Sequence, residues 1–147
     1  MRRLSYITML LLISGTVKLS SCRKEGCTDK TAKNYNEKAK KDDGTCTFEG
    51  SVVFWYDQSV ANFLDGTGAT TLYYYLDGQL VGSQGALMYW TSAPTCGQNS
   101  SITVTKDLGT VKSKTYTYKV IDQTGFEYWS GSLSVDANTC LKEQLTQ

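Results

Sequence analysis

The sequence contains no histidine among its 147 residues. Histidine is the side chain that serves most often as a general base near neutral pH and that binds metal ions most often. Without it, only a lysine or a carboxylate could activate one of the many serines and threonines. No GxSxG motif is present, and Gly66 and Gly68 do not belong to a GxGxxG phosphate loop. The sequence therefore predicts a protein that is not an enzyme and that has no cofactor and no resident metal.

An excess of charge of either sign is also lacking. The chain has 15 lysines and arginines and 14 aspartates and glutamates. Leaving out Arg2, Arg3 and Lys18, which fall within the first 21 residues, gives 12 basic against 14 acidic residues and a net charge of −2. Because nucleic-acid-binding domains present a basic patch, we expect no nucleic-acid partner.

No hydrophobic run is long enough to cross a bilayer as a helix. The longest one, residues 6–17, has about a dozen residues, whereas a transmembrane helix needs roughly 20. Arg2 and Arg3 precede it, and no acidic residue occurs before Glu25. A basic start, a short apolar stretch and small residues before a cleavage site are typical of an export signal. We predict a cleaved signal helix over residues 1–21.

The end of this segment, Leu19-Ser20-Ser21-Cys22, resembles the lipobox of bacterial lipoproteins. The resemblance implies cleavage before Cys22 and lipid, including palmitate-type chains, on the new amino-terminal cysteine. Two or more acyl chains hold a protein firmly on a membrane, since each buried CH₂ contributes about 0.8 kcal/mol. Lys18 departs from the usual uncharged stretch, and ordinary secretion with Cys22 as an odd thiol is the alternative. Arg23 is not the aspartate that resembles an inner-membrane retention signal, so the outer membrane is favoured, with its periplasmic or outer face left open.

Four further cysteines follow, an even number that is typical of disulfides in an oxidising compartment. They are Cys27, Cys46, Cys96 and Cys140. Of the three possible pairings we favour the one that separates them by region, Cys27 with Cys46 and Cys96 with Cys140. Loop closure would then contribute about 3 and about 4 kcal/mol, respectively. A zinc site is the alternative, but spacings of 19, 50 and 44 residues without a CxxC pair argue against it.

The composition changes near residue 48. Residues 23–47 are charged and have little to bury, whereas residues 49–147 are rich in β-branched and aromatic side chains. The segment 26–48 resembles a cysteine-framed motif of exported bacterial proteins, GCTDPxAxNYNxxAxxDDGSCxY. The residues in register are Cys27, Asp29, Ala32, Asn34, Tyr35, Asn36, Ala39, Asp42, Asp43, Gly44 and Cys46. Lys30, Thr45 and Phe48 depart from it. The resemblance implies a disulfide-stapled spacer, and we divide the chain into a signal (1–21), an anchor and spacer (22–48) and one domain (49–147).

The spacer also contains side chains with oxygens that could bind calcium. They are Asp29, Asn34, Asn36, Asp42 and Asp43. The EF-hand order is absent, however. We favour the alternative that these side chains cap turns of their own backbone.

Short β-branched and aromatic segments recur through residues 49–147. The expected strands are 51–56, 70–76, 79–81, 86–90, 101–105, 114–121, 127–135 and 140–145. Asp77-Gly78 predicts a type I′ turn between two of them. No apolar period of 3.6 residues is evident, so we expect an all-β, antiparallel two-sheet sandwich of about seven strands.

In general form this domain resembles the small immunoglobulin-like or prealbumin-like sandwiches of exported bacterial proteins. The carriers are Asp77-Gly78, Cys96-Gly97, Tyr116-Thr-Tyr118, Trp129-Ser-Gly131 and Cys140. Such domains act as spacers, binding modules or assembly parts, so the resemblance implies non-catalytic work.

Exposed aromatic side chains are the candidates for binding. We single out Tyr74, on the opposite strand face from Tyr73 and Tyr75, Trp90 beside a loop, and Phe63 in an expected loop over residues 59–66. The alternative is that most aromatics belong to the core or to cross-strand pairs. The leading hypothesis is a lipid-anchored envelope protein that binds a protein partner or a glycan. A structural part of an envelope complex is the alternative, and an envelope hydrolase is the remote one.

Overall fold

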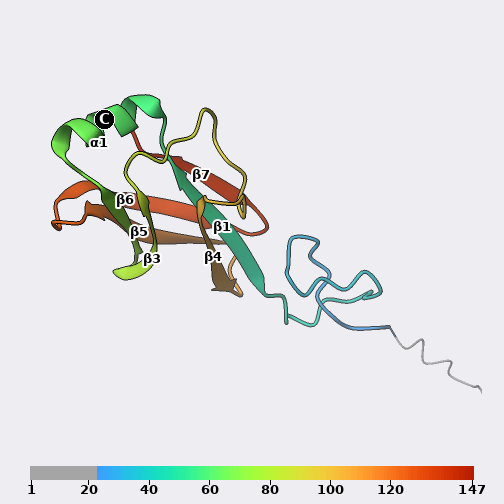
Figure 1. Ribbon diagram of the computed structural model, residues 1–147. Helices are drawn as coiled ribbons and strands as arrows, with labels where there is room; N and C mark the ends of the chain where they lie inside the picture. The colour runs from blue at the N-terminus through green and yellow to red at the C-terminus, as the bar shows by residue number, and fades with distance from the viewer. Residues whose placement is uncertain (1–22) are drawn as a thin grey trace, which may run out of the picture.

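The computed structural model describes residues 23–147 (Figure 1). The predicted signal helix and the lipidation site Cys22 lie outside these residues. Seven strands and one helix follow the spacer. They are β1 (Phe48–Trp55), α1 (Gln58–Thr67), β2 (Thr71–Leu76), β3 (Gln79–Gly85), β4 (Ile102–Gly109), β5 (Ser113–Asp122), β6 (Glu127–Asp136) and β7 (Cys140–Gln144).

The strands form two sheets, which confirms the predicted two-sheet β fold, and one short helix accompanies them. One sheet has the order β4-β1-β7 and the other the order β3-β2-β5-β6. All strand pairs are antiparallel except β1 and β7, which run parallel, so the wholly antiparallel prediction is wrong for this pair. The short connection 137–139 carries the chain from β6 in one sheet to β7 in the other. It is fixed by the Asn138 amide, which donates to the Glu49 carbonyl at 2.7 Å.

The core lies between the two sheets and follows from alternation along the strands. In β2, Leu72, Tyr74 and Leu76 are fully buried while their neighbours face outward. Phe54 of β1 meets Tyr74 across the sandwich with ring centroids 5.6 Å apart. Asp77 and Gly78 have φ values of 48° and 75°, as the predicted type I′ turn requires.

The helix α1 was not expected from the sequence, and residues 59–66 are not a loop. Asp57 caps its start by accepting hydrogen bonds from the Ser59 and Val60 amides, and Gly68 ends it in the left-handed conformation. One face of α1 packs against the sandwich through Val60, Ala61 and Leu64. Phe63 lies on the other face and is therefore exposed.

Residues 86–90 are not a strand either. The Tyr56 hydroxyl donates to the Ala86 carbonyl at 3.0 Å, and the Trp90 amide donates to the Tyr56 carbonyl at 2.9 Å. The segment thus wraps around the buried Tyr56 instead of pairing with a strand. Its apolar side chains at Leu87, Met88 and Tyr89 remain exposed.

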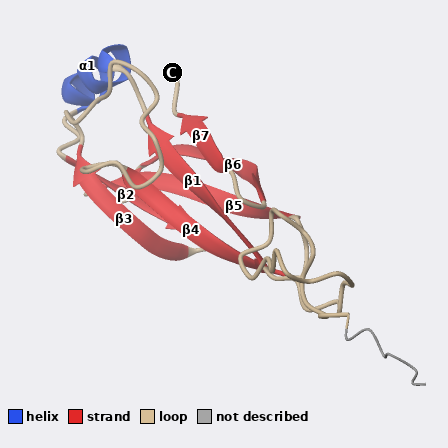
Figure 2. Cartoon of the chain, turned by 90° about the vertical axis from the view of Figure 1, so that its right-hand side faces the viewer, coloured by secondary structure: helices blue, strands red, loops and turns tan. Residues whose placement is uncertain are grey.

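The spacer and α1 lie at opposite ends of the sandwich, and β1 runs between them (Figures 1 and 2). The Cys27–Cys46 disulfide closes the spacer, and the Cys96–Cys140 disulfide joins the loop after β3 to β7, so the favoured pairing is present in the structure. Two ion pairs join the spacer to the base of the sandwich, Lys33 with Glu49 at 2.7 Å and Lys112 with Asp29 at 2.5 Å.

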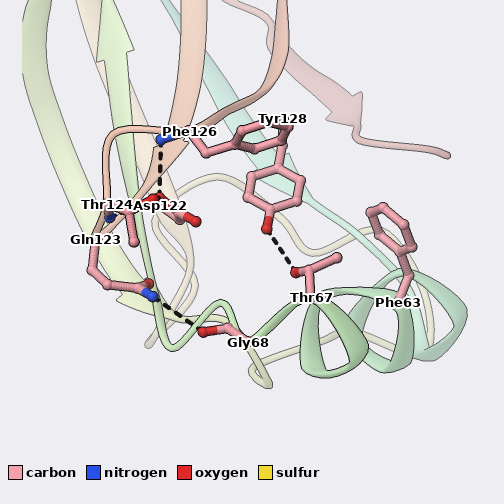
Figure 3. A pocket seen from close by; sticks show the side chains of 8 residues that line it. All are labelled: Phe63, Thr67, Gly68, Asp122, Gln123, Thr124, Phe126 and Tyr128. Carbon is pink, nitrogen blue, oxygen red and sulfur yellow. Dashed lines mark hydrogen bonds between the residues drawn. The ribbon is translucent and has the colours of Figure 1, made fainter.

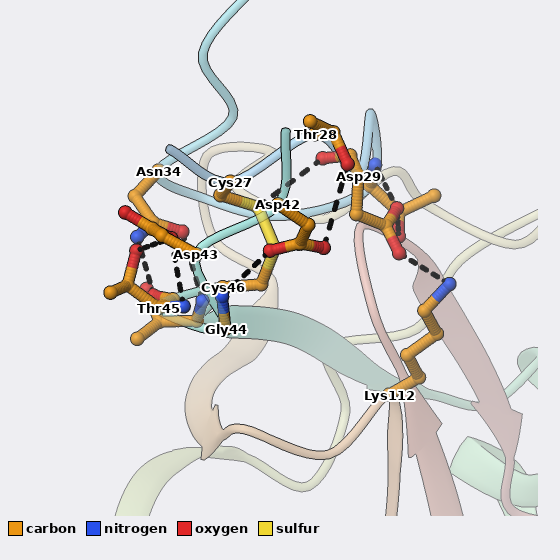
Figure 4. Close-up of a disulfide and its surroundings, with 12 residues drawn as sticks. Cys27, Thr28, Asp29, Asn34, Asp42, Asp43, Gly44, Thr45, Cys46 and Lys112 are labelled. Atoms are coloured by element: carbon orange, nitrogen blue, oxygen red, sulfur yellow. Dashed lines mark hydrogen bonds and ion pairs between the residues drawn. A yellow bond between two sulfur atoms is a disulfide. The ribbon is translucent and has the colours of Figure 1, made fainter. Parts of the chain in front are cut away.

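The aspartates of the spacer make turns with their own backbone (Figure 4). Asp29, Asp42 and Asp43 each accept a hydrogen bond from the amide two residues ahead. The hydrogen bond with Lys112, followed by those with Thr31, lowers the pKa of Asp29 to about 2. Within residues 23–147, no three cysteine or carboxylate side chains gather as a metal site would require.

Candidate functional site

The clearest concavity of the described chain lies at the α1 end of the sandwich. Two hollows, of about 370 and about 320 Å³, adjoin each other there and share Phe63, Phe126 and Tyr128. We call them together the aromatic pocket. The first hollow is also lined by Thr67, Gly68, Asp122, Gln123 and Thr124, and the second by Glu127, Trp129, Thr146 and Gln147.

Three segments contribute the side chains of the first hollow (Figure 3). Helix α1 contributes Phe63 from its exposed face, and the turn from β5 to β6 contributes Phe126. Tyr128, at the start of β6, stands between them. Its ring meets the Phe63 ring edge-on, with centroids 6.2 Å apart and planes at 87°, and the Phe126 ring at 5.0 Å and 73°. Such edge-to-face pairs are favourable for aromatic rings.

Two of these three rings are well exposed to solvent. The exposed fraction is 61% for Phe126 and 43% for Phe63. Tyr128 and Trp129 are half-buried, and Trp129 continues the cluster inward by stacking on the buried Tyr56 at 6.3 Å. The aromatic pocket is therefore rooted in the core at one side and exposed at the other.

Asp122 holds the turn that carries Phe126. It is only 6% exposed, the one buried charged residue of residues 23–147. Its Oδ1 accepts three hydrogen bonds, from the Thr124 amide at 2.7 Å, the Thr124 hydroxyl at 2.6 Å and the Phe126 amide at 3.0 Å. The bond from the Thr124 hydroxyl is the largest of the causes that lower the pKa of Asp122, so the carboxylate is charged at neutral pH.

Two side-chain contacts tie α1 to the sheet beneath the aromatic pocket (Figure 3). Gln123 donates to the Gly68 carbonyl at 3.1 Å, while its Oε1 accepts from the Thr70 amide at 3.0 Å. The hydroxyls of Thr67 and Tyr128 lie 2.6 Å apart. The position of the helix is thus fixed relative to β5 and β6, which makes the pocket preformed.

The three residues singled out from the sequence do not come together. Phe63 lines both hollows of the aromatic pocket. Tyr74 is fully buried in the core, where its hydroxyl accepts a hydrogen bond from Gln84 at 2.8 Å, so the prediction that it contacts a ligand is wrong. Alternation in β2 turns it inward, and it is Tyr73 and Tyr75 that face outward. Trp90 is half-exposed in the loop after β3 and does not line the pocket.

Sequence reasoning did not identify Asp122 and Phe126. A signal was nevertheless present, because Asp122-Gln-Thr-Gly125 has the composition of a turn, and a large apolar residue directly after such a turn has little chance of burial. Gly125 takes a φ of 90° there.

A second exposed apolar surface lies in the loop after β3. Leu87, Met88 and Tyr89 are 57%, 49% and 41% exposed. They lie between Ala86 and Trp90, which both hydrogen-bond to Tyr56, and none of the three lines the aromatic pocket. We call this surface the 87–89 segment.

No helix within residues 23–147 combines the length and the apolar character needed to traverse a bilayer. No protein-family model, curated protein or solved structure matches the chain.

Proposed function

We propose that the protein is a lipid-anchored binding module of the bacterial cell envelope that engages its ligand through the aromatic pocket. The observation that carries this proposal is the position of the pocket. Helix α1, which carries one of its exposed rings, lies at the end of the sandwich opposite the spacer (Figures 1 and 2). In the sequence, the spacer directly follows the proposed lipidation site Cys22. An anchor at one end and a preformed concavity at the other suit a protein that presents a binding site away from a membrane.

The anchor is supported by the lipobox-like residues Leu19–Cys22 and by the spacer that follows them. Two disulfides suggest an extracytoplasmic protein, since such bonds persist outside the reducing cytoplasm. Arg23 after the cysteine favours the outer membrane. Because the spacer is stapled and joined to the sandwich by two ion pairs, it would hold the domain off the bilayer in a defined orientation.

The binding role is supported by the chemistry of the aromatic pocket. Ligand sites are concave and largely apolar, with a few polar groups that fix orientation. Here the rings of Phe63, Phe126 and Tyr128 line the pocket together with the buried carboxylate of Asp122. We therefore propose a non-catalytic contact with a protein partner or a glycan.

An assembly role within an envelope complex is the second candidate. It is favoured by the 87–89 segment, because three consecutive exposed apolar residues are typical of a contact surface. This segment could pack against another protein without any use of the aromatic pocket.

The anchor is tested by labelling cells that express the full chain with palmitate. We expect label in the wild-type protein and none in the Cys22→Ala variant. Absence of label from the wild-type protein, or label that survives this substitution, would refute the anchor.

The site is tested by binding of the purified protein to a glycan array and by capture of partners from solubilised envelope. We expect Phe126→Ala to abolish the signal and Leu80→Ala to preserve it, because Leu80 is similarly exposed (56%) but lies on β3 outside the pocket. A signal lost in Met88→Ala and retained in Phe126→Ala would instead support the assembly role.

A further inference from the structure

The hydrogen-bonding state of the aromatic pocket narrows the chemistry of its ligand, if the proposed function is correct. Every hydroxyl that lines the first hollow has a defined partner for its proton. Thr67 donates to the Leu64 carbonyl at 2.7 Å, and Thr124 donates to Asp122 at 2.6 Å. A hydroxyl has one proton, so the 2.6 Å contact between Thr67 and Tyr128 must use the proton of Tyr128.

Acceptor capacity, in contrast, is left over. All three hydrogen bonds to the Asp122 side chain end on Oδ1, so Oδ2 accepts none from the described residues, and Asp122 lines the first hollow. Figure 3 shows the carboxylate on the wall across from Thr67 and Tyr128. The Tyr128 and Thr124 oxygens also retain lone pairs, whereas the one side-chain donor of the first hollow without a partner among the described residues is the second N–H of Gln123.

The charge of the lining has one sign. Of the residues that line the two hollows, Asp122 and Glu127 are acidic and none is basic. Asp122 is more than nine-tenths buried, and its three hydrogen bonds offset the cost of burying the charge. A positively charged ligand would add an ion pair at Oδ2, whereas the turn provides hydrogen bonds only to Oδ1.

The aromatic rings favour the same kind of ligand. Phe63 and Phe126 both stand edge-on to Tyr128, so the hollow is bordered by rings in different orientations. Aromatic faces attract cations through their quadrupole, and several rings around one site act together. Apolar rings also pack against the methylene groups of an alkyl stem.

We propose that the aromatic pocket binds a primary alkylammonium group, with the ammonium donating to Asp122 and the alkyl stem lying against the rings. The source of this group is a lysine side chain of a partner protein or a free diamine, which share the same chemistry. A neutral sugar fits the first hollow less well, because it needs donors as well as acceptors and this hollow has only the one side-chain donor of Gln123 to give.

The test is a titration of the purified protein, followed by NMR shifts of the Phe126 and Tyr128 amides and of the Trp129 indole. Pentylammonium is the probe, and pentan-1-ol and pentanoate are the neutral and anionic controls of similar size. We expect saturable binding of pentylammonium, at least tenfold weaker binding of pentan-1-ol and none of pentanoate. Equal binding of the ammonium and the alcohol would overturn the proposal, as would failure of pentylammonium to bind.

A matched pair of variants isolates the carboxylate. Asp122→Asn keeps an oxygen for the three hydrogen bonds of the turn but removes the charge and replaces the free acceptor by a donor. We expect it to weaken pentylammonium binding at least tenfold and to leave pentan-1-ol binding unchanged. Asp136→Asn, at an exposed position outside the pocket, should change neither. Undiminished pentylammonium binding by Asp122→Asn would overturn the proposal.

Two further probes distinguish the sources. Nα-acetyl-lysine methylamide represents a protein side chain and cadaverine a free diamine, and tighter binding of one identifies the source. If neither binds, while a neutral oligosaccharide or a captured partner still depends on Phe126, the ammonium proposal fails and the proposed binding function stands. If no tested ligand or partner shows binding that depends on Phe126, the proposed function itself is refuted.

Discussion

The attachment of α1 to the sandwich gives a prediction of stability, because this helix carries one wall of the aromatic pocket. Leu64 is fully buried on the inner face of α1, beside Val60 and Ala61, which are each 3% exposed. Leu64→Ala removes three buried carbon atoms and leaves a cavity that the neighbouring strands close only in part. Substitutions of this kind cost 2–5 kcal/mol, and complete burial places the expected loss of unfolding free energy at about 3–4 kcal/mol.

The assay is urea unfolding of the purified protein with its disulfides intact, followed by tryptophan fluorescence. Comparison of midpoints is valid if the slope of the transition is unchanged. Phe63→Ala is the matched control, because Phe63 lies on the same helix but is 43% exposed. Its loss should cost less than about 1 kcal/mol, mainly through the edge contact with Tyr128. A cost below about 1 kcal/mol for Leu64→Ala, or a larger cost for Phe63→Ala, would refute the attachment described for α1.

Three further predictions concern other parts of the fold. Loop entropy predicts that replacing the pair Cys96 and Cys140 by serine costs about 4 kcal/mol, and the pair Cys27 and Cys46 about 3 kcal/mol, over loops of 44 and 19 residues; denaturant unfolding checks the order, and a reversed order contradicts the argument. A Cβ on Gly50 would lie 2.3 Å from the Asp136 carbonyl oxygen, so Gly50→Ala should destabilise the fold by about 2 kcal/mol or more. Gly66 lies in helix α1 with open space around it, so Gly66→Ala should stabilise the fold by about 0.5–1 kcal/mol. Equal thermal midpoints for the two variants would contradict both expectations. Burial raises the pKa of Tyr56 to about 12 and that of the fully buried Tyr74 well above 10. Because the unfolded chain loses these protons at lower pH than the folded one, the stability of the fold should be full below pH 10 and fall between pH 10 and 12. The thermal midpoint of Tyr56→Phe should fall less steeply over this range.

The parts of the fold that the sequence predicted correctly are those in which a local rule and the tertiary structure agree. The alternation in 114–121 and 127–135 reflects strands with one buried face, and β5 and β6 extend these ranges by one residue or two. Asp77-Gly78 defines its turn because few other residues accept positive φ at both positions. The disulfide pairing followed from the boundary near residue 48, since cysteines within one folded unit are those brought close together.

Helix α1 was missed because its apolar period is too short to detect. Ten residues bury only Val60, Ala61 and Leu64, and the exposed Phe63 lies between them and obscures the pattern. The ends of the helix are better marked than its middle. Asp57 before Ser59 and Gly68 after Thr67 have the composition of a helix start and a helix stop, and reading those two signals together would have predicted the helix.

The parallel pairing of β7 with β1 and the wrapping of residues 86–90 have a different origin. No local sequence feature distinguishes a strand that joins the sheet of the preceding strand from one that joins the opposite sheet. The apolar content of 86–90 indicates a strand, but the buried hydroxyl of Tyr56 needs an acceptor, and it takes the Ala86 carbonyl. A polar group that lies thirty residues earlier in the chain thus determines the conformation of this segment.

The candidate site was less predictable than the fold for the same physical reason. Its aromatic rings come mainly from α1, from the turn before β6 and from the first residues of β6, and each of these is a place where regular alternation stops. Where alternation stops, a large ring such as Phe126 has no opposite sheet to cover it, and the backbone amides of the turn need a side-chain acceptor such as Asp122. The exposed ring and the buried carboxylate are therefore two consequences of one turn. The proposed ligand would contact both, because its apolar stem would cover the exposed ring and its ammonium would pair with the carboxylate.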